Sequence, residues 1–199
     1  MTRSAAARTR FRRTLWPTAV GLVVVTTAII GTLASQSASS AATEADGAIT
    51  EHDGAVPDGV TVFDDEYPGV ANVEPDLLEA LRRAATDAAD DGVEFSVNSG
   101  WRSAEYQSQL LREAVSEYGS EEEAARWVAS PGTSAHVSGD AVDIGSFDAT
   151  AWLSEHGAEY GLCQIYGNEP WHYELRPEAI DRGCPPVYAD PTEDPRMQE

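Results

Sequence analysis

The feature that most limits the fold is the restriction of regularly spaced apolar residues to one stretch, residues 70–184. The flanking segments, residues 43–69 and 185–199, are polar, acidic and rich in Gly, Pro and Asp. Such segments bury too little apolar surface to offset the entropy lost on ordering. We therefore predict one folded domain over residues 70–184, between an acidic flexible linker at 43–69 and a loose acidic tail at 185–199. A chain of 199 residues has no room for two large domains.

Residues 1–42 have the order of a secretory signal. An arginine-rich start precedes an apolar stretch at residues 19–33, and small residues follow up to Ala42. The apolar stretch contains three threonines and is shorter than the roughly 20 residues of a membrane span. This favours a cleaved signal peptide, with an uncleaved N-terminal anchor as the alternative. In both cases we expect the rest of the chain outside the cytoplasm, secreted or in the cell envelope, with membrane contact only through an uncleaved segment.

The charge distribution excludes one class of partner. All 13 basic residues are arginines, and only eight of them follow the first acidic residue, Glu44, whereas all 34 Asp and Glu lie from there on. The eight arginines are scattered, so the sequence offers no basic stripe for a phosphate backbone. We therefore predict no nucleic-acid partner.

The chain has two cysteines, Cys163 and Cys184. Outside the cytoplasm, two thiols in a small domain more often pair than stay free. Thiolate metal ligation is the alternative, but it needs more cysteines or a CxxC spacing. We therefore predict a Cys163–Cys184 disulfide that closes a loop around residues 169–172.

Within the predicted domain, helical patterns come early and strand patterns late. Apolar residues recur at helical spacing over residues 77–88, between Glu74-Pro-Asp and Gly92, and again over residues 104–118. Later patterns indicate a helix over residues 148–156 and strands at residues 93–97, 141–144, 164–166 and 171–175. Since regular βαβ alternation is absent from this pattern, we predict an α+β fold: a small, mostly antiparallel sheet with helices packed on it.

Two histidines of this domain lie in polar, turn-rich sequence. His136 precedes Asp143 by seven residues, and on a continuous strand the two would point to opposite faces, roughly 23 Å apart. The Ser-Gly pair between them supplies a turn that could bring them together. Similarly, the proline after Glu169 interrupts a strand ladder and could aim Glu169 and His172 at one spot.

Two His, one Asp and a nearby Glu match the composition of a catalytic zinc site. Such a site has three protein ligands, an open position for water and a carboxylate that takes the proton of that water. Because spacings this irregular do not specify a site by themselves, a set of unrelated polar residues remains the alternative.

Three motifs occur in order at compatible separations. They are Ser99-Gly-Trp-Arg102-Ser followed by Tyr106-Gln107, an SxHxxGxAxD pattern over residues 134–143, and an ExWH pattern over residues 169–172. On these motifs, residues 77–184 resemble the zinc-dependent D-alanyl-D-alanine carboxypeptidases and dipeptidases of the vancomycin-resistance type, most nearly the carboxypeptidase branch.

The resemblance implies a set of site residues, with no departure at any position. Zn²⁺ would be held by His136, Asp143 and His172. Glu169 would act as the catalytic base, accepting a proton from water and passing it to the departing amine. Arg102 would lie next to the scissile carbonyl and stabilise the oxyanion through its planar fork of donors; pairing with a surface carboxylate is its structural alternative.

Two further residues are candidates for substrate binding. Ser134 matches the family pattern and would hydrogen-bond the substrate. Gln107 is a second candidate, although it fits an exposed helix position equally well.

The resemblance implies an exported zinc D,D-carboxypeptidase, expected to be a monomer, that removes the terminal D-Ala from peptidoglycan stem peptides. An L,D-carboxypeptidase, a D,D-dipeptidase and a wall endopeptidase are alternatives, because these enzymes share the zinc machinery and differ in pocket walls. The dipeptidase is less favoured, since an exported enzyme would not meet a cytoplasmic dipeptide pool. A non-catalytic cell-wall binding module is the alternative from another class, but binding alone has no need of Glu169 as a base.

Overall fold

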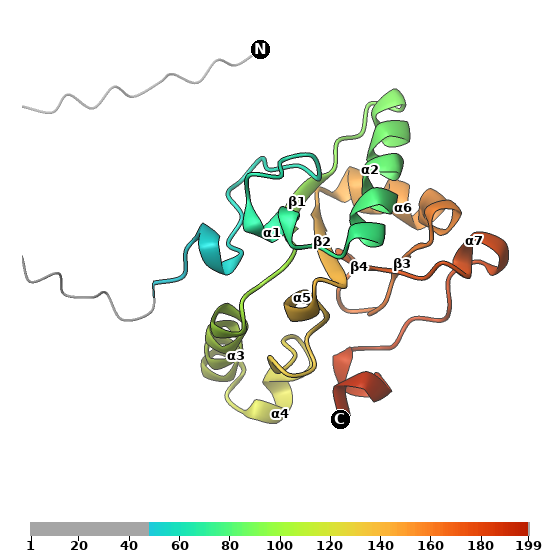
Figure 1. Ribbon diagram of the computed structural model, residues 1–199. Helices are drawn as coiled ribbons and strands as arrows, with labels where there is room; N and C mark the ends of the chain where they lie inside the picture. The colour runs from blue at the N-terminus through green and yellow to red at the C-terminus, as the bar shows by residue number, and fades with distance from the viewer. Residues whose placement is uncertain (1–47, 199) are drawn as a thin grey trace, which may run out of the picture. The chain divides into compact units, whose positions relative to one another are not determined.

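The computed structural model of the protein describes residues 48–198 (Figure 1). The predicted signal peptide or anchor, residues 1–42, lies outside the described residues. Among the helices of residues 48–198, none is both long and apolar enough to cross a membrane. The α-helices are α1 (Pro68–Ala71), α2 (Pro75–Asp90), α3 (Ala104–Tyr118), α4 (Glu121–Ala124), α5 (Ala135–Ser138), α6 (Phe147–His156) and α7 (Ala179–Arg182).

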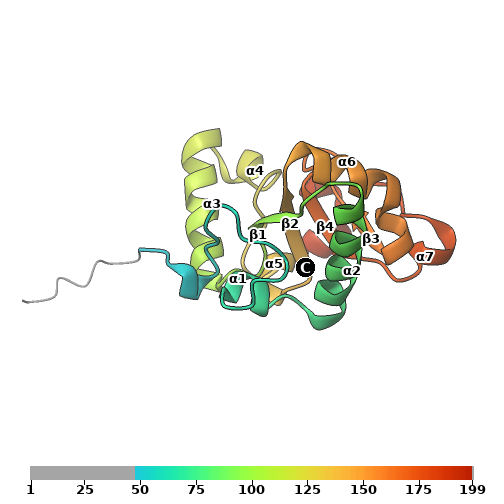
Figure 2. The ribbon, with the colours of Figure 1, turned by 90° about the horizontal axis from the view of Figure 1, so that it is seen from above.

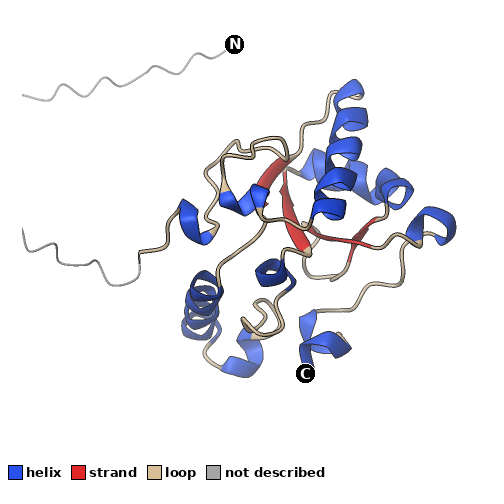
Figure 3. Ribbon diagram, in the orientation of Figure 1, coloured by secondary structure: helices blue, strands red, loops and turns tan. Residues whose placement is uncertain are grey.

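Four short strands form one antiparallel sheet in the order β1-β2-β4-β3 (Figure 3). The strands are β1 (Ser96–Ser99), β2 (Ala141–Gly145), β3 (Leu162–Gln164) and β4 (His172–Leu175). Short 3-10 turns lie at Glu51–Asp53, Gly157–Tyr160, Pro191–Glu193 and Pro195–Gln198. The α+β prediction with an antiparallel sheet is confirmed.

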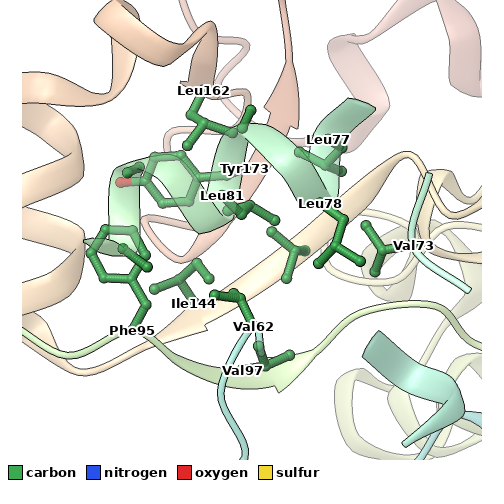
Figure 4. Packing of buried hydrophobic residues seen from close by; sticks show 14 of the residues in the cluster. Val62, Val73, Leu77, Leu78, Leu81, Phe95, Val97, Ile144, Leu162 and Tyr173 are labelled. Atoms are coloured by element: carbon green, nitrogen blue, oxygen red, sulfur yellow. The ribbon is translucent and has the colours of Figure 1, made fainter. Parts of the chain in front are cut away.

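Helices lie on both sides of the sheet. Figures 1 and 2 show α2 and α6 together on one side of the strands and α3 and α4 on the other. The sheet face toward α2 and α6 is apolar, with Val142, Ile144 and Tyr173 in the main hydrophobic cluster (Figure 4). Because side chains alternate along a strand, Asp143, between Val142 and Ile144, and His172, next to Tyr173, point to the other face. The hydrophobic core therefore fixes the sheet from one side and leaves the opposite face for polar groups.

Helix α2 begins and packs as the sequence predicts. The Glu74 side chain accepts hydrogen bonds from the backbone N–H groups of Asp76 and Leu77, which caps the helix start next to Pro75. Its apolar residues lie in the main cluster: Leu77, Leu78, Leu81, Ala84, Ala85 and Ala88. The helix predicted over residues 104–118 is likewise present as α3, capped by Ser103.

Two strands are shifted from their predicted positions, β1 by a local hydrogen bond at the end of α2 and β3 by pairing with a distant segment. β1 begins at Ser96 rather than at residue 93, because the Val93 N–H still bonds to Ala88 O at the end of α2. β3 ends at Gln164 rather than at residue 166. The residues on either side of Tyr166 hydrogen-bond instead to Tyr188 of the C-terminal segment.

The segment predicted as a linker differs from that prediction over its described part, residues 48–69. Val60 and Val62 are buried in the main cluster. Val60 O accepts a hydrogen bond from Val97 N at 2.8 Å, and Asp53 O accepts one from Ser103 N at 2.8 Å. The average composition of the segment does not reveal these few apolar residues, which are buried in the main cluster.

The acidic tail is also packed against the domain. We call residues 185–198 the C-terminal segment; it leads from α7 back to the loop after β3 (Figure 1). Tyr188 and Met197 pack against a second, smaller hydrophobic cluster that contains Ile165 and Tyr166. The predicted disulfide between Cys163 and Cys184 is present and ties the start of the segment to β3. This packing contradicts the loose tail expected from composition.

Candidate active site

Three neighbouring strands place polar side chains in one row on the face opposite the core. Asp143 of β2 pairs with Ser99 of β1 and with His172 of β4. A register shift between Val97 and Ser99 turns Ser99 to this face while Val97 stays in the core. Because directly opposed residues of an antiparallel pair project to the same side, Ser99, Asp143 and His172 share this polar face.

His136 reaches the same point from a short helix rather than from a strand. Helix α5 ends at Ser138 and is followed by Gly139, whose φ of 85° is a left-handed conformation that favours glycine. A Cβ there would lie 2.6 Å from Asn72 O. This turn carries the chain from His136 into β2, so His136 and Asp143 meet as the sequence analysis allowed. The His136 ring is oriented by its Nδ1–H, which donates to Gly100 O at 2.8 Å.

Three ligand atoms converge on one point. His136 Nε2 lies 3.2 Å from His172 Nδ1, and each of these nitrogens lies 3.3 Å from Asp143 Oδ1. Within residues 48–198, Asp143 Oδ1 is buried without a hydrogen-bond partner. A tetrahedral zinc ion with bonds of about 2.0–2.1 Å separates its ligand atoms by about 3.3 Å. The donor set and its spacing therefore fit a metal ion held by these three residues.

Burial and neighbouring charges set the protonation of the three residues. Burial together with the nearby Arg102 guanidinium lowers the pKa of His136. The pKa of Asp143 lies well below its usual range, because His136, His172 and Arg102 outweigh the cost of burial. Burial opposes the charged form of His172, but the carboxylates of Asp143 and Glu174, which face its two ring nitrogens, raise its pKa to about 9. Asp143 is therefore ionised, and of the two imidazoles only that of His172 favours its charged form.

Arg102 is held rigidly beside this point. Its Nη2 donates to Asp143 Oδ2 at 2.7 Å, its Nε to Ser99 Oγ at 2.7 Å, and its Nη1 to Gln107 Oε1 at 3.2 Å. Gln107 is buried and donates in turn to Ala129 O at 2.8 Å, so the exposed-helix alternative for Gln107 is wrong. These bonds use three of the five guanidinium N–H groups, which leaves two for a ligand. The surface ion-pair alternative for Arg102 is also wrong, since its partner is the buried Asp143.

Glu169 lies next to the converging atoms without joining them. Its Oε2 is 3.7 Å from His172 Nδ1, and its buried Oε1 finds no hydrogen-bond partner in the described part of the chain. Burial raises the pKa of Glu169 to about 7, and the neighbouring Asp143 adds to the shift. Glu169 is thus a carboxyl group that can hold or release a proton near neutral pH.

These residues line a cavity of about 200 Å³. Ser134 also lines it, and Trp127 and Trp171 stand at its edge, partly exposed. The C-terminal segment contributes Pro191. The structure thus brings every site residue predicted from the motifs to one cavity; their assignment as ligands, base and substrate-binding groups stays a prediction.

The residues on the far side of the His172 ring were not predicted from the sequence. His172 Nε2–H donates to Glu174 Oε1 at 3.3 Å, and Arg196 donates to both oxygens of Glu174. The pKa of Glu174 is lowered because its hydrogen bonds to His172 and Arg196 outweigh the effect of burial. The spacing of two residues on one strand could have pointed to Glu174. Nothing in the local sequence indicates Arg196, which lies in the segment predicted to be a loose tail.

Comparisons with known proteins give the same family as the motifs. Residues 71–178 match the family model of VanY, D-alanyl-D-alanine carboxypeptidase. A D-alanyl-D-alanine carboxypeptidase of Enterococcus faecalis (strain ATCC 700802 / V583) is 35% identical over 123 residues, which are 49% of this chain and 43% of that protein. The chain thus matches less than half the length of this curated relative.

Two solved structures are similar in fold and sequence. VanYB in complex with D-alanine-D-alanine is 30% identical with a TM-score of 0.51, covering 56% of this chain and 74% of that one. The LD-carboxypeptidase LdcB is 25% identical with a TM-score of 0.51, covering 67% of this chain and 73% of that one. The family model spans more than half of the 199 residues, and the chain belongs to the VanY family of D-alanyl-D-alanine carboxypeptidases.

Proposed function

We propose that the protein is an exported zinc D,D-carboxypeptidase that removes the terminal D-Ala from peptidoglycan stem peptides. The observation that carries the proposal is the convergence of His136 Nε2, Asp143 Oδ1 and His172 Nδ1 beside the buried, partnerless Glu169 Oε1 of the described structure. When bound by these three residues, zinc supplies a Lewis acid that makes water a nucleophile near neutral pH.

Glu169 is the group we assign to proton transfer. A carboxylate with a pKa near 7 can accept a proton from attacking water and deliver it to the departing amine. Its buried Oε1 accepts no hydrogen bond from any group within residues 48–198, so this oxygen is free to bond to the attacking water. A module that only binds cell wall has no use for such a group, which favours the enzyme over the binding module.

Arg102 is the group we assign to the developing oxyanion. Its two remaining N–H groups can donate to the carbonyl oxygen as negative charge builds on it. Its anchoring by Ser99, Gln107 and Asp143 fixes it before substrate arrives, so little reorganisation is needed. Ser134, on the cavity wall, offers a hydroxyl for the peptide.

The substrate's position outside the membrane agrees with the export signal predicted over residues 1–42. An L,D-carboxypeptidase is the second candidate, because the chain is as similar in fold to LdcB as to VanYB. The two activities differ in the residue before the scissile bond, so peptide length and stereochemistry separate them.

The test is hydrolysis of a synthetic stem pentapeptide ending in D-Ala-D-Ala, with and without a zinc chelator. We expect release of one D-Ala that stops on chelation and returns with zinc. The corresponding tetrapeptide is the second arm: cleavage of the tetrapeptide alone would replace the proposal by the L,D-carboxypeptidase. Failure with both peptides, and with cross-linked muropeptides, by folded and zinc-loaded protein would overturn a peptidase function.

A further inference from the structure

Glu174 takes no part in the chemistry proposed above, yet it is almost completely buried, with 1% of its surface exposed. It lies across the His172 ring from the converging atoms, since Nδ1 faces His136 and Asp143 while Nε2 faces Glu174. An ionised carboxylate can only accept hydrogen bonds, so Nε2–H donates to Oε1. A partner of this kind fixes both the tautomer and the orientation of a metal-binding imidazole.

Two guanidinium groups hold Glu174, and they do so differently. Arg176 Nη2 contacts only Oε2, at 2.6 Å. Arg196 contacts both oxygens, Oε2 through Nη1 at 2.8 Å and Oε1 through Nη2 at 3.1 Å. Among residues 48–198, Arg196 is thus the one group besides His172 that bonds to Oε1. A bidentate grip sets the plane of a carboxylate as well as its position.

Arg196 is itself fixed by buried partners. Asp194 is fully buried and accepts from Arg196 Nε at 3.0 and 3.1 Å and from its backbone N at 3.0 Å. Asp194 Oδ2 also accepts from Tyr166 OH at 3.0 Å, and the Tyr166 ring lies 5.1 Å from the His172 ring. The contacts therefore close a circuit from His172 through Glu174, Arg196, Asp194 and Tyr166 back to His172.

The C-terminal segment that carries Arg196 is attached at several points. Tyr188 N donates to Ile165 O at 3.0 Å, and Tyr188 O accepts from Gly167 N at 2.8 Å. Asp190 pairs with Arg126 at 3.0 Å. The segment lies beyond residues 71–178, the range that matches the family model, so these contacts come from outside the matched range.

We propose that Arg196 is a positioning residue that holds Glu174 against His172. Through Arg196, the C-terminal segment fixes the orientation of a metal-binding histidine. The inference rests on the proposed function for the presence of zinc. It assigns a role in this site to residues 185–198, whose composition alone indicates only a loose tail.

The test measures metal binding by the full chain, apart from its activity. Zinc affinity is determined by competition with a chromophoric chelator for the wild type, Arg196→Gln and Arg196→Lys. We expect Arg196→Gln to raise the zinc Kd about tenfold, as loss of an outer partner does, and to change the visible spectrum of the Co²⁺-substituted protein. Arg196→Lys keeps a charge that reaches one oxygen and should recover part of the affinity.

Two further variants separate positioning from folding. Arg196→Gln leaves Asp194 buried without its cation, so the double variant Asp194→Asn/Arg196→Gln removes both charges and should show the same loss of zinc affinity in a stable protein. Arg126→Gln is the matched control, because it removes an ion pair of the C-terminal segment, that of Asp190, without touching Glu174. Its zinc Kd should stay within twofold of the wild type.

The outcomes distinguish this inference from the proposed function. If the wild type binds zinc but cleaves no stem peptide, the proposed function fails, and the zinc affinities still decide the role of Arg196. If the double variant binds zinc as tightly as the wild type, with an unchanged Co²⁺ spectrum, Arg196 has no positioning role. The inference is also overturned if Arg126→Gln weakens zinc binding as much as Arg196→Gln, since attachment of the segment would then suffice.

Discussion

The two sides of the His172 ring are built in opposite ways. On the cavity side, two buried oxygens, Asp143 Oδ1 and Glu169 Oε1, have no hydrogen-bond partner in the described structure. On the rear side, both oxygens of Glu174 are bonded, by His172, Arg176 and Arg196. A buried polar atom without a partner costs about 1–3 kcal/mol. Such atoms are tolerated where a metal and a substrate would bind, and the rear side supplies the rigid support.

The largest effect should come from the cavity side. Glu169→Gln removes a proton acceptor and keeps the shape, so kcat for the pentapeptide should fall by about 10²–10⁴. Zinc Kd should stay within twofold, because Glu169 is not among the converging atoms. Steady-state kinetics at matched zinc content measure this, with the exposed Glu117→Gln as the control. If both variants retain wild-type kcat, the assignment of Glu169 as the base is wrong.

The disulfide between Cys163 and Cys184 helps to attach the C-terminal segment, which supports the Glu174 side of the His172 ring. Cys163→Ala/Cys184→Ala opens a cross-link between residues 21 apart and should lower the free energy of unfolding by about 3 kcal/mol on the loop-entropy account. Urea unfolding of the oxidised wild type and the double variant measures the difference. Equal midpoints and slopes would show that the small hydrophobic cluster and the ion pairs hold the segment without the cross-link.

Gln107 tests the anchoring of Arg102 on the cavity side. Gln107→Ala removes a hydrogen bond to a charged group and should lower kcat/KM about tenfold. The zinc affinity should not change, because Asp143 keeps its bond to Arg102 Nη2. Gln109→Ala, which removes a side-chain hydrogen bond to Glu113 at a half-buried position of the same helix, is the matched control. A wild-type kcat/KM for Gln107→Ala would show that Ser99 and Asp143 suffice to hold the guanidinium.

The smallest expected effect is a change in the free energy of unfolding at acid pH, caused by the carboxylates near Arg196. The pKa of Asp194 is lowered because hydrogen bonds and charge from Arg196 outweigh burial, and the pKa of Glu174 is lowered as well. A lowered folded-state pKa gives stability that is present above the unfolded pKa, about 4, and lost as pH falls toward the folded value.

We therefore expect the stability difference between the wild type and Arg196→Gln to shrink by roughly 1 kcal/mol between pH 5 and pH 3. Urea unfolding at both pH values, with a chelator present, measures it. A difference that is constant with pH would mean that Arg196 stabilises through packing rather than through these carboxylates.

Much of this protein could be predicted from short stretches of sequence. Helices α2 and α3 were predicted because their caps and apolar spacings are local. The motif residues were predicted as a set, and the structure brings them to one cavity. Their mutual distances could not be predicted, because they depend on the left-handed turn at Gly139 and on the register of β2 with β4.

The linker and loose tail predicted at residues 43–69 and 185–199 differ from the structure of their described parts for one physical reason. Composition reports the average capacity of a segment to bury apolar surface, and both segments are polar on average. Val60 and Val62 nevertheless enter the main core, and Tyr188 and Met197 pack on the smaller cluster. A few apolar residues suffice when the surface that receives them is already built by the rest of the chain.

The sequence by itself determined the α+β class, the family motifs and the residue types that meet at the cavity, because these depend on residue type and on contacts between near neighbours. Only the tertiary structure decided which oxygen of Asp143 faces the histidines and which arginine supports Glu174. Glu174 and Arg196 are 22 residues apart, and they meet because the disulfide and the pairing of Tyr188 return the C-terminal segment to the sheet. Such a contact has no local signal, since it depends on the path of the whole chain.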